Sequence, residues 1–212
     1  MNMPSPPRAP RRIPALIALA LLGMLQLSGL ALAQADSTAP TAASPAAAPF
    51  RLAAEDQRPE LGPLLPQHQL IGKSRLTVWG FQVYDARLWA APGFKSDSLP
   101  THSFALELAY LRDFANTDVA KRSILEMRRS AEISEAQSKA WTTEMLRVIP
   151  DVKKGDRIMG LNRPGVGAVF LVNGKPSGEI RDTEFARLFF GIWLSPKTSE
   201  PKMRSALLAE AL

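Results

Sequence analysis

Hydrogen-bonding side chains that could recognise a ligand recur along two segments that alternate apolar and polar residues, 74–92 and 103–112. They are Arg75, Gln82, Tyr84, Arg87, Tyr110 and Arg112. Arginine donates two parallel hydrogen bonds to a carboxylate or phenolate, and tyrosine adds a hydroxyl donor on a rigid apolar ring. The set predicts a pocket for a small amphipathic anion between a sheet and a helical layer. The alternative is that these residues only pack or form the solvated face of the sheet.

Nucleophilic catalysis and metal binding find little support in the composition. The chain has no cysteine, and its two histidines, His68 and His102, lie in loop-type segments with no acid beside them. Gly165 and Gly167 lie in a segment that lacks the Lys-Ser pair and the following helix of a phosphate loop. We therefore expect no metal and no other cofactor.

The first 33 residues have the pattern of a secretory signal peptide. Three arginines precede an apolar stretch over residues 13–32, and Ala31 and Ala33 are the small residues that a cleavage site requires. We expect cleavage after Ala33, a periplasmic or secreted product, and no stable membrane anchor afterwards. A retained N-terminal anchor is the alternative, because the apolar stretch is almost long enough to span a bilayer.

The next segment, 34–67, is predicted to be a disordered tether. Its first half contains mostly alanine, proline, serine and threonine, which cannot bury enough apolar surface to offset the entropy of ordering. We expect the folded domain over residues 68–212. The formal net charge of +6 falls to +3 once the three arginines of the signal peptide are removed. This small excess is not clustered, so a nucleic-acid partner is not expected.

The periodicity of residues 68–212 predicts strands, two helices, more strands and two further helices. Phe104, Leu106, Leu108 and Tyr110 alternate as in a half-buried strand, and Asn173-Gly174 is a strong hairpin signal. Helical spacing starts near Asn116, after Ser134, after Asp182 and at Pro201. This order favours an α+β fold in which helices cover one face of an antiparallel sheet.

Five segments, "GKSRLTVWGFQVYDARLW", "LELAYLRDF", "VKKGDRI", "GVGAVFLVNGKPSGEI" and "EFARLFFGIWLSP", resemble the bacterial secreted branch of the chalcone isomerase-like family. The resemblance extends over about residues 71–208. It implies an open-faced β-sandwich with a ligand cleft between the sheet and the helices. The plant enzymes of this fold cyclise a chalcone by adding a phenolate to an enone. Non-catalytic relatives bind fatty acids and use an arginine to hold the carboxylate.

Carried over by position, the resemblance implies that Arg75 is the anion-binding arginine. Gln82 stands where the enzymes have a catalytic threonine. On the following helix, where the enzymes have tyrosine, lysine and asparagine, this chain has Asp118, Lys121 and Leu125.

The departures from the enzyme pattern favour binding of an anionic ligand of fatty-acid or phenolic type over chalcone cyclisation. The expected ligand-binding residues are Arg75, Gln82, Tyr84, Tyr110 and Lys121. Two alternatives stay open. One is an isomerase, of the intramolecular lyase type, that acts on another substrate. The other is an envelope protein without enzymatic activity that binds a protein partner through exposed tryptophans.

Overall fold

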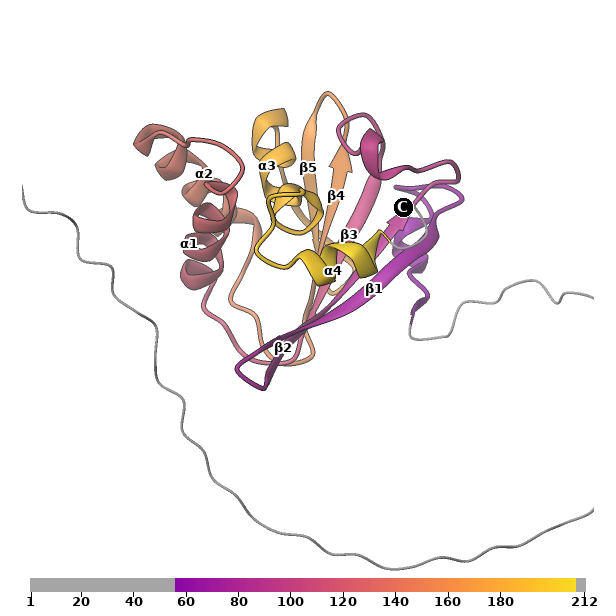
Figure 1. Ribbon diagram of the computed structural model, residues 1–212, viewed down its shortest axis with the longest axis horizontal. Helices are drawn as coiled ribbons and strands as arrows, with labels where there is room; N and C mark the ends of the chain where they lie inside the picture. The colour runs from indigo at the N-terminus through magenta and orange to yellow at the C-terminus, as the bar shows by residue number, and fades with distance from the viewer. Residues whose placement is uncertain (1–55, 209–212) are drawn as a thin grey trace, which may run out of the picture. The chain divides into compact units, whose positions relative to one another are not determined.

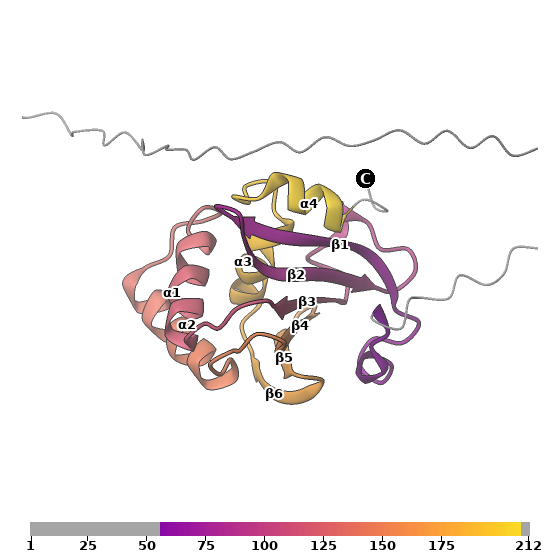
Figure 2. The same ribbon diagram turned by 90° about the horizontal axis from the view of Figure 1, so that it is seen from below.

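The structure is a computed structural model that describes residues 56–208. The expected signal peptide, its cleavage site and residues 34–55 of the expected tether lie outside the described residues. Within the described part, an antiparallel sheet is covered on one face by helices, as Figures 1 and 2 show. No helix of residues 56–208 combines the length and the apolar character needed to cross a bilayer.

Each of the six strands of the described sheet pairs with its neighbours in sequence, so the strand order is β1 to β6 without a crossover. The strands are β1 (Gln69–Val78), β2 (Phe81–Ala90), β3 (Phe104–Tyr110), β4 (Arg157–Arg163), β5 (Gly167–Val172) and β6 (Lys175–Ile180). Short 3₁₀ turns, Pro59–Leu61 and Ser96–Ser98, precede β1 and β3. Helices α1 (Asn116–Met127) and α2 (Glu135–Val148) join β3 to β4, and α3 (Thr183–Leu194) and α4 (Pro201–Leu207) follow β6. The predicted α+β class and element order are confirmed.

Alternation along the strands produces two different faces. Phe104, Leu106, Leu108 and Tyr110 of β3 belong to the large core beneath the helices, whereas Ala105 belongs to a smaller apolar cluster on the outer face. Successive side chains of a strand point to opposite faces, so these assignments follow directly from the sequence pattern. The face that carries Tyr110 is therefore the face that the helices cover.

The helices are placed by their caps and by their apolar stripes. Ser134 accepts a hydrogen bond from the Gln137 amide and completes the predicted capping box of α2. Asp182 caps α3 by accepting from the Phe185 amide, and it also accepts a 2.8 Å hydrogen bond from Trp141 Nε1 of α2. The α3 stripe, which includes Phe189 and Trp193, is buried in the main core. The helix predicted after Asp182 is therefore confirmed.

The folded part begins before His68, which differs from the prediction of a tether up to residue 67. Leu61 and Leu65 are buried against the outer face of the sheet, where they pack with Trp89, Met159 and neighbouring residues. Figure 1 shows this indigo segment on the side of the sheet opposite α1 and α2. A pattern read along the chain cannot show which distant surface two leucines will cover, so a proline-rich segment resembles a linker.

Ion pairs hold the same segment in place. The Arg58 guanidinium binds both oxygens of the buried Glu107 carboxylate, and Arg157 donates a third hydrogen bond to it, at 2.9 Å. Asp56 accepts hydrogen bonds from Lys73 and Arg87 at 2.9 and 2.8 Å. Buried charges are tolerated when partners satisfy them, and here they tie residues 56–60 to β1, β2, β3 and β4.

Two tight hairpins connect neighbouring strands. Val78 pairs with Phe81 across Trp79-Gly80, and Val172 pairs with Lys175 across Asn173-Gly174. All four turn residues have positive φ, as a type I′ turn requires. The hairpin predicted at Asn173-Gly174 is present, and Trp79-Gly80 forms a second one.

Candidate ligand-binding cavity

A cavity of about 550 Å³ lies between the β1–β3 end of the sheet and helices α1 and α3. Its walls are mainly apolar and include Leu76, Phe81, Leu108, Phe114, Val119, Ile158, Phe189, Ile192 and Trp193. Ligand pockets in proteins have volumes of roughly 300–1,000 Å³ and combine apolar walls with a few polar groups. The cavity therefore has the size and the character of a site for a small molecule with an apolar body.

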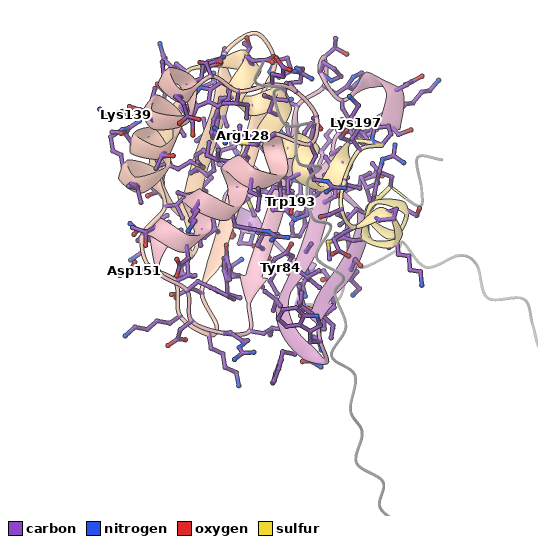
Figure 3. The ribbon with its side chains drawn as sticks, turned by 60° about the vertical axis from the view of Figure 1, so that its left-hand side comes forward. Tyr84, Arg128, Lys139, Asp151, Trp193 and Lys197 are labelled. Atoms are coloured by element: carbon purple, nitrogen blue, oxygen red, sulfur yellow. The ribbon has the colours of Figure 1, made fainter. Side chains whose placement is uncertain are left out.

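Two tyrosines from neighbouring strands form the polar part of the sheet wall. Tyr84 of β2 stands directly opposite Tyr110 of β3, and their ring centroids are 6.1 Å apart in an edge-to-face arrangement. The Tyr84 hydroxyl accepts a 3.0 Å hydrogen bond from Trp193 Nε1 of α3. Figure 3 labels Tyr84 and Trp193, which lie close together.

Tyr110 differs from Tyr84 in the hydrogen bonding of its hydroxyl group. The side chain is only 5% exposed and packs against Phe114, with ring centroids 5.8 Å apart. Its hydroxyl has no hydrogen-bond partner among residues 56–208, although Tyr110 lines the cavity. The hydroxyl is not among the fully buried polar atoms that lack a partner, so it is accessible and can donate a hydrogen bond to a ligand or to water.

Both tyrosine hydroxyls stay protonated at neutral pH. Burial raises the pKa of Tyr84 to about 12; the hydrogen bond from Trp193 opposes this rise, and the carboxylates of Glu200 and Glu126 add to it. Burial also raises the pKa of Tyr110, and the neighbouring Tyr84 adds to that shift. The acidic residues of the lining are Asp113, Asp118, Glu126 and Glu200.

Helix α1 contributes a buried carboxylate to the lining. Glu126 is 8% exposed and forms an ion pair of 2.7 Å with Arg122 through Oε1. Its Oε2 is 3.7 Å from Arg129 Nε and has no hydrogen-bond partner in the described part of the chain. Ser123 also lines the cavity, but its hydroxyl donates to the Val119 carbonyl of its own helix. Glu126 is therefore a buried acidic group of α1 that retains hydrogen-bonding capacity, and Asp118 of the same helix is an exposed acid of the lining.

Arg112 is the cation at the β1–β2 end of the cavity. Its guanidinium carbon lies 4.8 Å from the centre of the Phe81 ring, in a cation–π arrangement. Arg112 is exposed and has no ion pair with any residue that the structure describes. By contrast, Arg122, the other lining cation, is already paired with Glu126.

Of the five predicted site residues, only Tyr84 and Tyr110 line the cavity. Arg75 was predicted to be the anion anchor, and this prediction is corrected: Arg75 lies on the outer face and donates hydrogen bonds of 2.6 and 2.8 Å to Asp85. Because Leu76 faces the cavity, the alternation of β1 directs its neighbour Arg75 away from it. Arg87 of β2 likewise lies on the outer face, where it binds Asp56.

Gln82 and Lys121 also lie outside the lining, for different reasons. The β1–β2 register shifts between Leu76 and Thr77, so β2 carries a bulge at Val83. The bulge reverses the alternation, and Val83 lines the cavity whereas Gln82 is exposed. Lys121 is exposed because the buried stripe of α1 begins one position earlier, at Ala120.

The sequence analysis missed several lining residues, notably Glu126, Arg122, Trp193 and Phe114. Ser123 and Glu126 each lie one position from the apolar stripe residues Ile124 and Met127, so both fall on the buried side of α1. That position was the signal in the sequence for a buried polar group. Trp193 was recognised only as part of the packing stripe of α3.

The comparisons with known proteins agree with this architecture. A sheet with a helical layer on one face is the chalcone isomerase-like fold, which the structure shares with a fatty-acid binding protein of Arabidopsis thaliana at a TM-score of 0.53. That likeness covers 68% of this chain and 88% of the other, at 10% sequence identity. The family model described as chalcone isomerase-like matches residues 69–209, so the chain belongs to this family. An uncharacterised protein of Haemophilus influenzae is 26% identical over 143 residues, which are 67% of this chain and 68% of that protein.

Proposed function

We propose that this protein binds a small amphipathic acid, of fatty-acid or phenolic type, in the cavity between the sheet and the helices. The observation that carries the proposal is the apolar cavity of about 550 Å³, whose lining includes Tyr110 with a hydroxyl that binds no described residue. The Arabidopsis protein of the same fold is named as a fatty-acid binding protein, which supports the choice of ligand class.

The charges around the cavity favour one orientation of such a ligand. Carboxylates of Glu126 and Glu200 lie on the Tyr84 side and would repel an acid group there. Arg112 is the lining cation without an ion pair to a described residue; it lies two residues beyond Tyr110 in the chain and next to Asp113, which also lines the cavity. The ligand carboxylate is therefore placed at Arg112 with the Tyr110 hydroxyl as a second donor. The apolar body extends along Leu108, Ile158 and Phe189.

The assay is displacement of a dansyl-labelled fatty acid from the purified protein, with Arg112→Gln as the test variant. Arg75→Gln is the matched control, because it removes an exposed guanidinium from the same end of the sheet but from the outer face. Loss of a hydrogen bond to a charged group costs about 1.5–3 kcal/mol, so we expect Arg112→Gln to weaken binding by about ten- to a hundredfold. Arg75→Gln is expected to leave the affinity unchanged.

A second ligand sharpens this test. The methyl ester of the same fatty acid keeps the apolar body but has no charge, so its affinity should be equal for the Arg112 variant and the unaltered protein. Equal loss of affinity for acid and ester in Arg112→Gln would contradict the proposed orientation. Failure of the unaltered protein to bind any probe would contradict the proposed function itself.

The proposal includes export, which is supported by the arginines, the apolar stretch and the Ala31/Ala33 pattern of the N-terminal region. Sequencing the N-terminus of the protein isolated from its host tests this part. We expect the mature chain to start at Gln34, and a chain that retains residues 1–33 would refute cleavage.

A further inference from the structure

The turn between β1 and β2 exposes a group of apolar side chains. Trp79 is 93% exposed, Phe81 is 59% exposed and Val78 is 38% exposed. Figure 1 shows the β1–β2 turn at the lower edge of the folded part, at the opposite end from α3. Isolated apolar residues are ordinary on a surface, but an adjacent group that includes a fully exposed tryptophan indicates a contact with something apolar.

The backbone conformation of this turn does not favour a tryptophan at position 79. Trp79 and Gly80 have φ values of 51° and 83°, and Asn173 and Gly174 of the β5–β6 turn have 51° and 79°. Asparagine suits the first position of such a turn because its side chain tolerates positive φ and binds nearby backbone groups. Asn173 does so by accepting from the Arg157 amide, whereas Trp79 has no side-chain partner among the described residues. The same chain thus places a bulky aromatic residue where the turn favours asparagine.

The exposed group is continuous with the cavity. Val78, Trp79, Phe81 and Arg112 line the cavity and also form the outer edge of the hairpin end. A ligand that enters or leaves at this end passes the side chains of Trp79 and Phe81. An amphipathic acid partitions into membranes, so a protein that takes one up or delivers it gains from opening its cavity towards a bilayer.

Three cations at this end of the sheet can reach lipid phosphates. Arg112, Lys153 and Lys154 are exposed and have no ion pairs with described residues. The carboxylates of Asp113 and Asp156 lie among them and keep their charge while they accept hydrogen bonds from the Lys154 and Lys153 amides. A tryptophan with basic residues around it is the combination that anchors proteins at the membrane–water interface.

We propose that the β1–β2 turn, with Trp79 and Phe81 at its tip, docks on a lipid bilayer and opens the cavity to the membrane. The docking surface stands on the exposed residues and the turn geometry, and its purpose rests on the proposed ligand function. A lipid surface is the chosen partner because a tryptophan at the tip of a turn is a side chain that the membrane–water interface favours, and because the same residues line the cavity.

The test uses vesicles of phosphatidylcholine and phosphatidylglycerol with bromine on the acyl chains, which quench tryptophan by contact. The other three tryptophans of the chain, Trp89, Trp141 and Trp193, are buried. Trp89 and Trp141 do not line the cavity and serve as the unquenched background. We expect bromine to quench part of the emission of the unaltered protein. Trp79→Asn should remove this quenching and weaken vesicle binding by about tenfold or more, the scale expected when a large apolar side chain no longer leaves water.

The Trp79→Asn variant recreates the Asn-Gly pair of the β5–β6 turn, so it should fold at least as well as the unaltered protein, with a urea midpoint that is equal or higher. Because Trp79 also lines the cavity, the affinity of the variant for the dansyl probe is measured in solutions without vesicles, and a loss of vesicle binding that exceeds the loss of probe binding separates docking from ligand binding. Vesicle binding without quenching of Trp79 would overturn the proposal, because another segment would then hold the lipid. Absence of vesicle binding would overturn it as well, and capture of a protein by the turn would identify a protein partner instead.

Discussion

The two tyrosines of the cavity should respond in opposite ways to the loss of one oxygen atom. Tyr84 and Tyr110 are paired across β2 and β3, and both line the cavity. Phenylalanine at either position keeps the ring and its edge-to-face contact. The hydroxyl of Tyr84 satisfies Trp193 Nε1, whereas the hydroxyl of Tyr110 satisfies no described residue. The change therefore isolates the hydrogen bond from the packing.

The expected magnitudes follow from this difference. Tyr84→Phe leaves the buried indole N–H of Trp193 without an acceptor, which should lower the free energy of unfolding by about 1–3 kcal/mol. Tyr110→Phe removes a hydroxyl that binds no described residue and is not fully buried. The free energy of unfolding should then change by less than about 0.5 kcal/mol, because no hydrogen bond within the protein is lost. Tyr110→Phe should instead weaken binding of the fatty-acid probe, by about 0.5–1.5 kcal/mol.

Urea unfolding followed by circular dichroism measures the first effect, with the slope of each transition checked against that of the unaltered protein. Displacement of the dansyl probe measures the second. Equal destabilisation by the two substitutions would show that the Tyr110 hydroxyl has a partner in solution and would refute the assignment of a free donor. Unchanged probe binding by Tyr110→Phe would remove this hydroxyl from the site.

The pH dependence of stability should have an acidic and an alkaline limb. Hydrogen bonding by Arg75 lowers the pKa of Asp85; for Asp56, burial alone would raise the pKa, but hydrogen bonds from Arg87 and Lys73 outweigh it and lower the pKa. A lowered folded-state pKa contributes stability above the unfolded value, so stability should fall as the pH drops below about 4. The pKa of Tyr84 is raised to about 12, chiefly by burial, so its contribution is complete below pH 10 and is lost as the pH rises towards 12. Two pKa units correspond to about 3 kcal/mol at most. Urea midpoints across the pH range test both limbs: a midpoint that holds below pH 3 would contradict the first, and an alkaline limb of equal size in Tyr84→Phe would contradict the second.

Much of the architecture could be predicted because it depends on local periodicity. The alternation in β3, the capping box at Ser134 and the stripe of α3 each produce a signal within a few residues. The family resemblance then added the fold, and the family match and the structure agree with it. Tyr84 and Tyr110 were identified as cavity residues from the same alternation.

The predictions from the sequence were wrong where a strand irregularity, or a contact between residues far apart in the chain, decides which way a side chain faces. The bulge at Val83 reverses which residues of β2 face inwards, and nothing in the residue types of the segment marks it. Arg75 was assigned to the ligand site by its place in the family motif. It instead donates two hydrogen bonds to Asp85 of the paired strand on the outer face. The burial of Leu61 and Leu65 likewise depends on Trp89 and Met159, which are remote in the chain.

The sequence by itself determined which segments become strands and helices, which strand faces are apolar, and which family the chain belongs to. These properties follow from side-chain chemistry repeated at short, regular spacing. Only the tertiary structure decided that Arg112 rather than Arg75 lies at the cavity, that Trp193 binds Tyr84, and that Glu126 retains an unpaired oxygen. Each of these depends on how strands and helices that are far apart in sequence meet, and the direction of a single side chain there follows from packing and register.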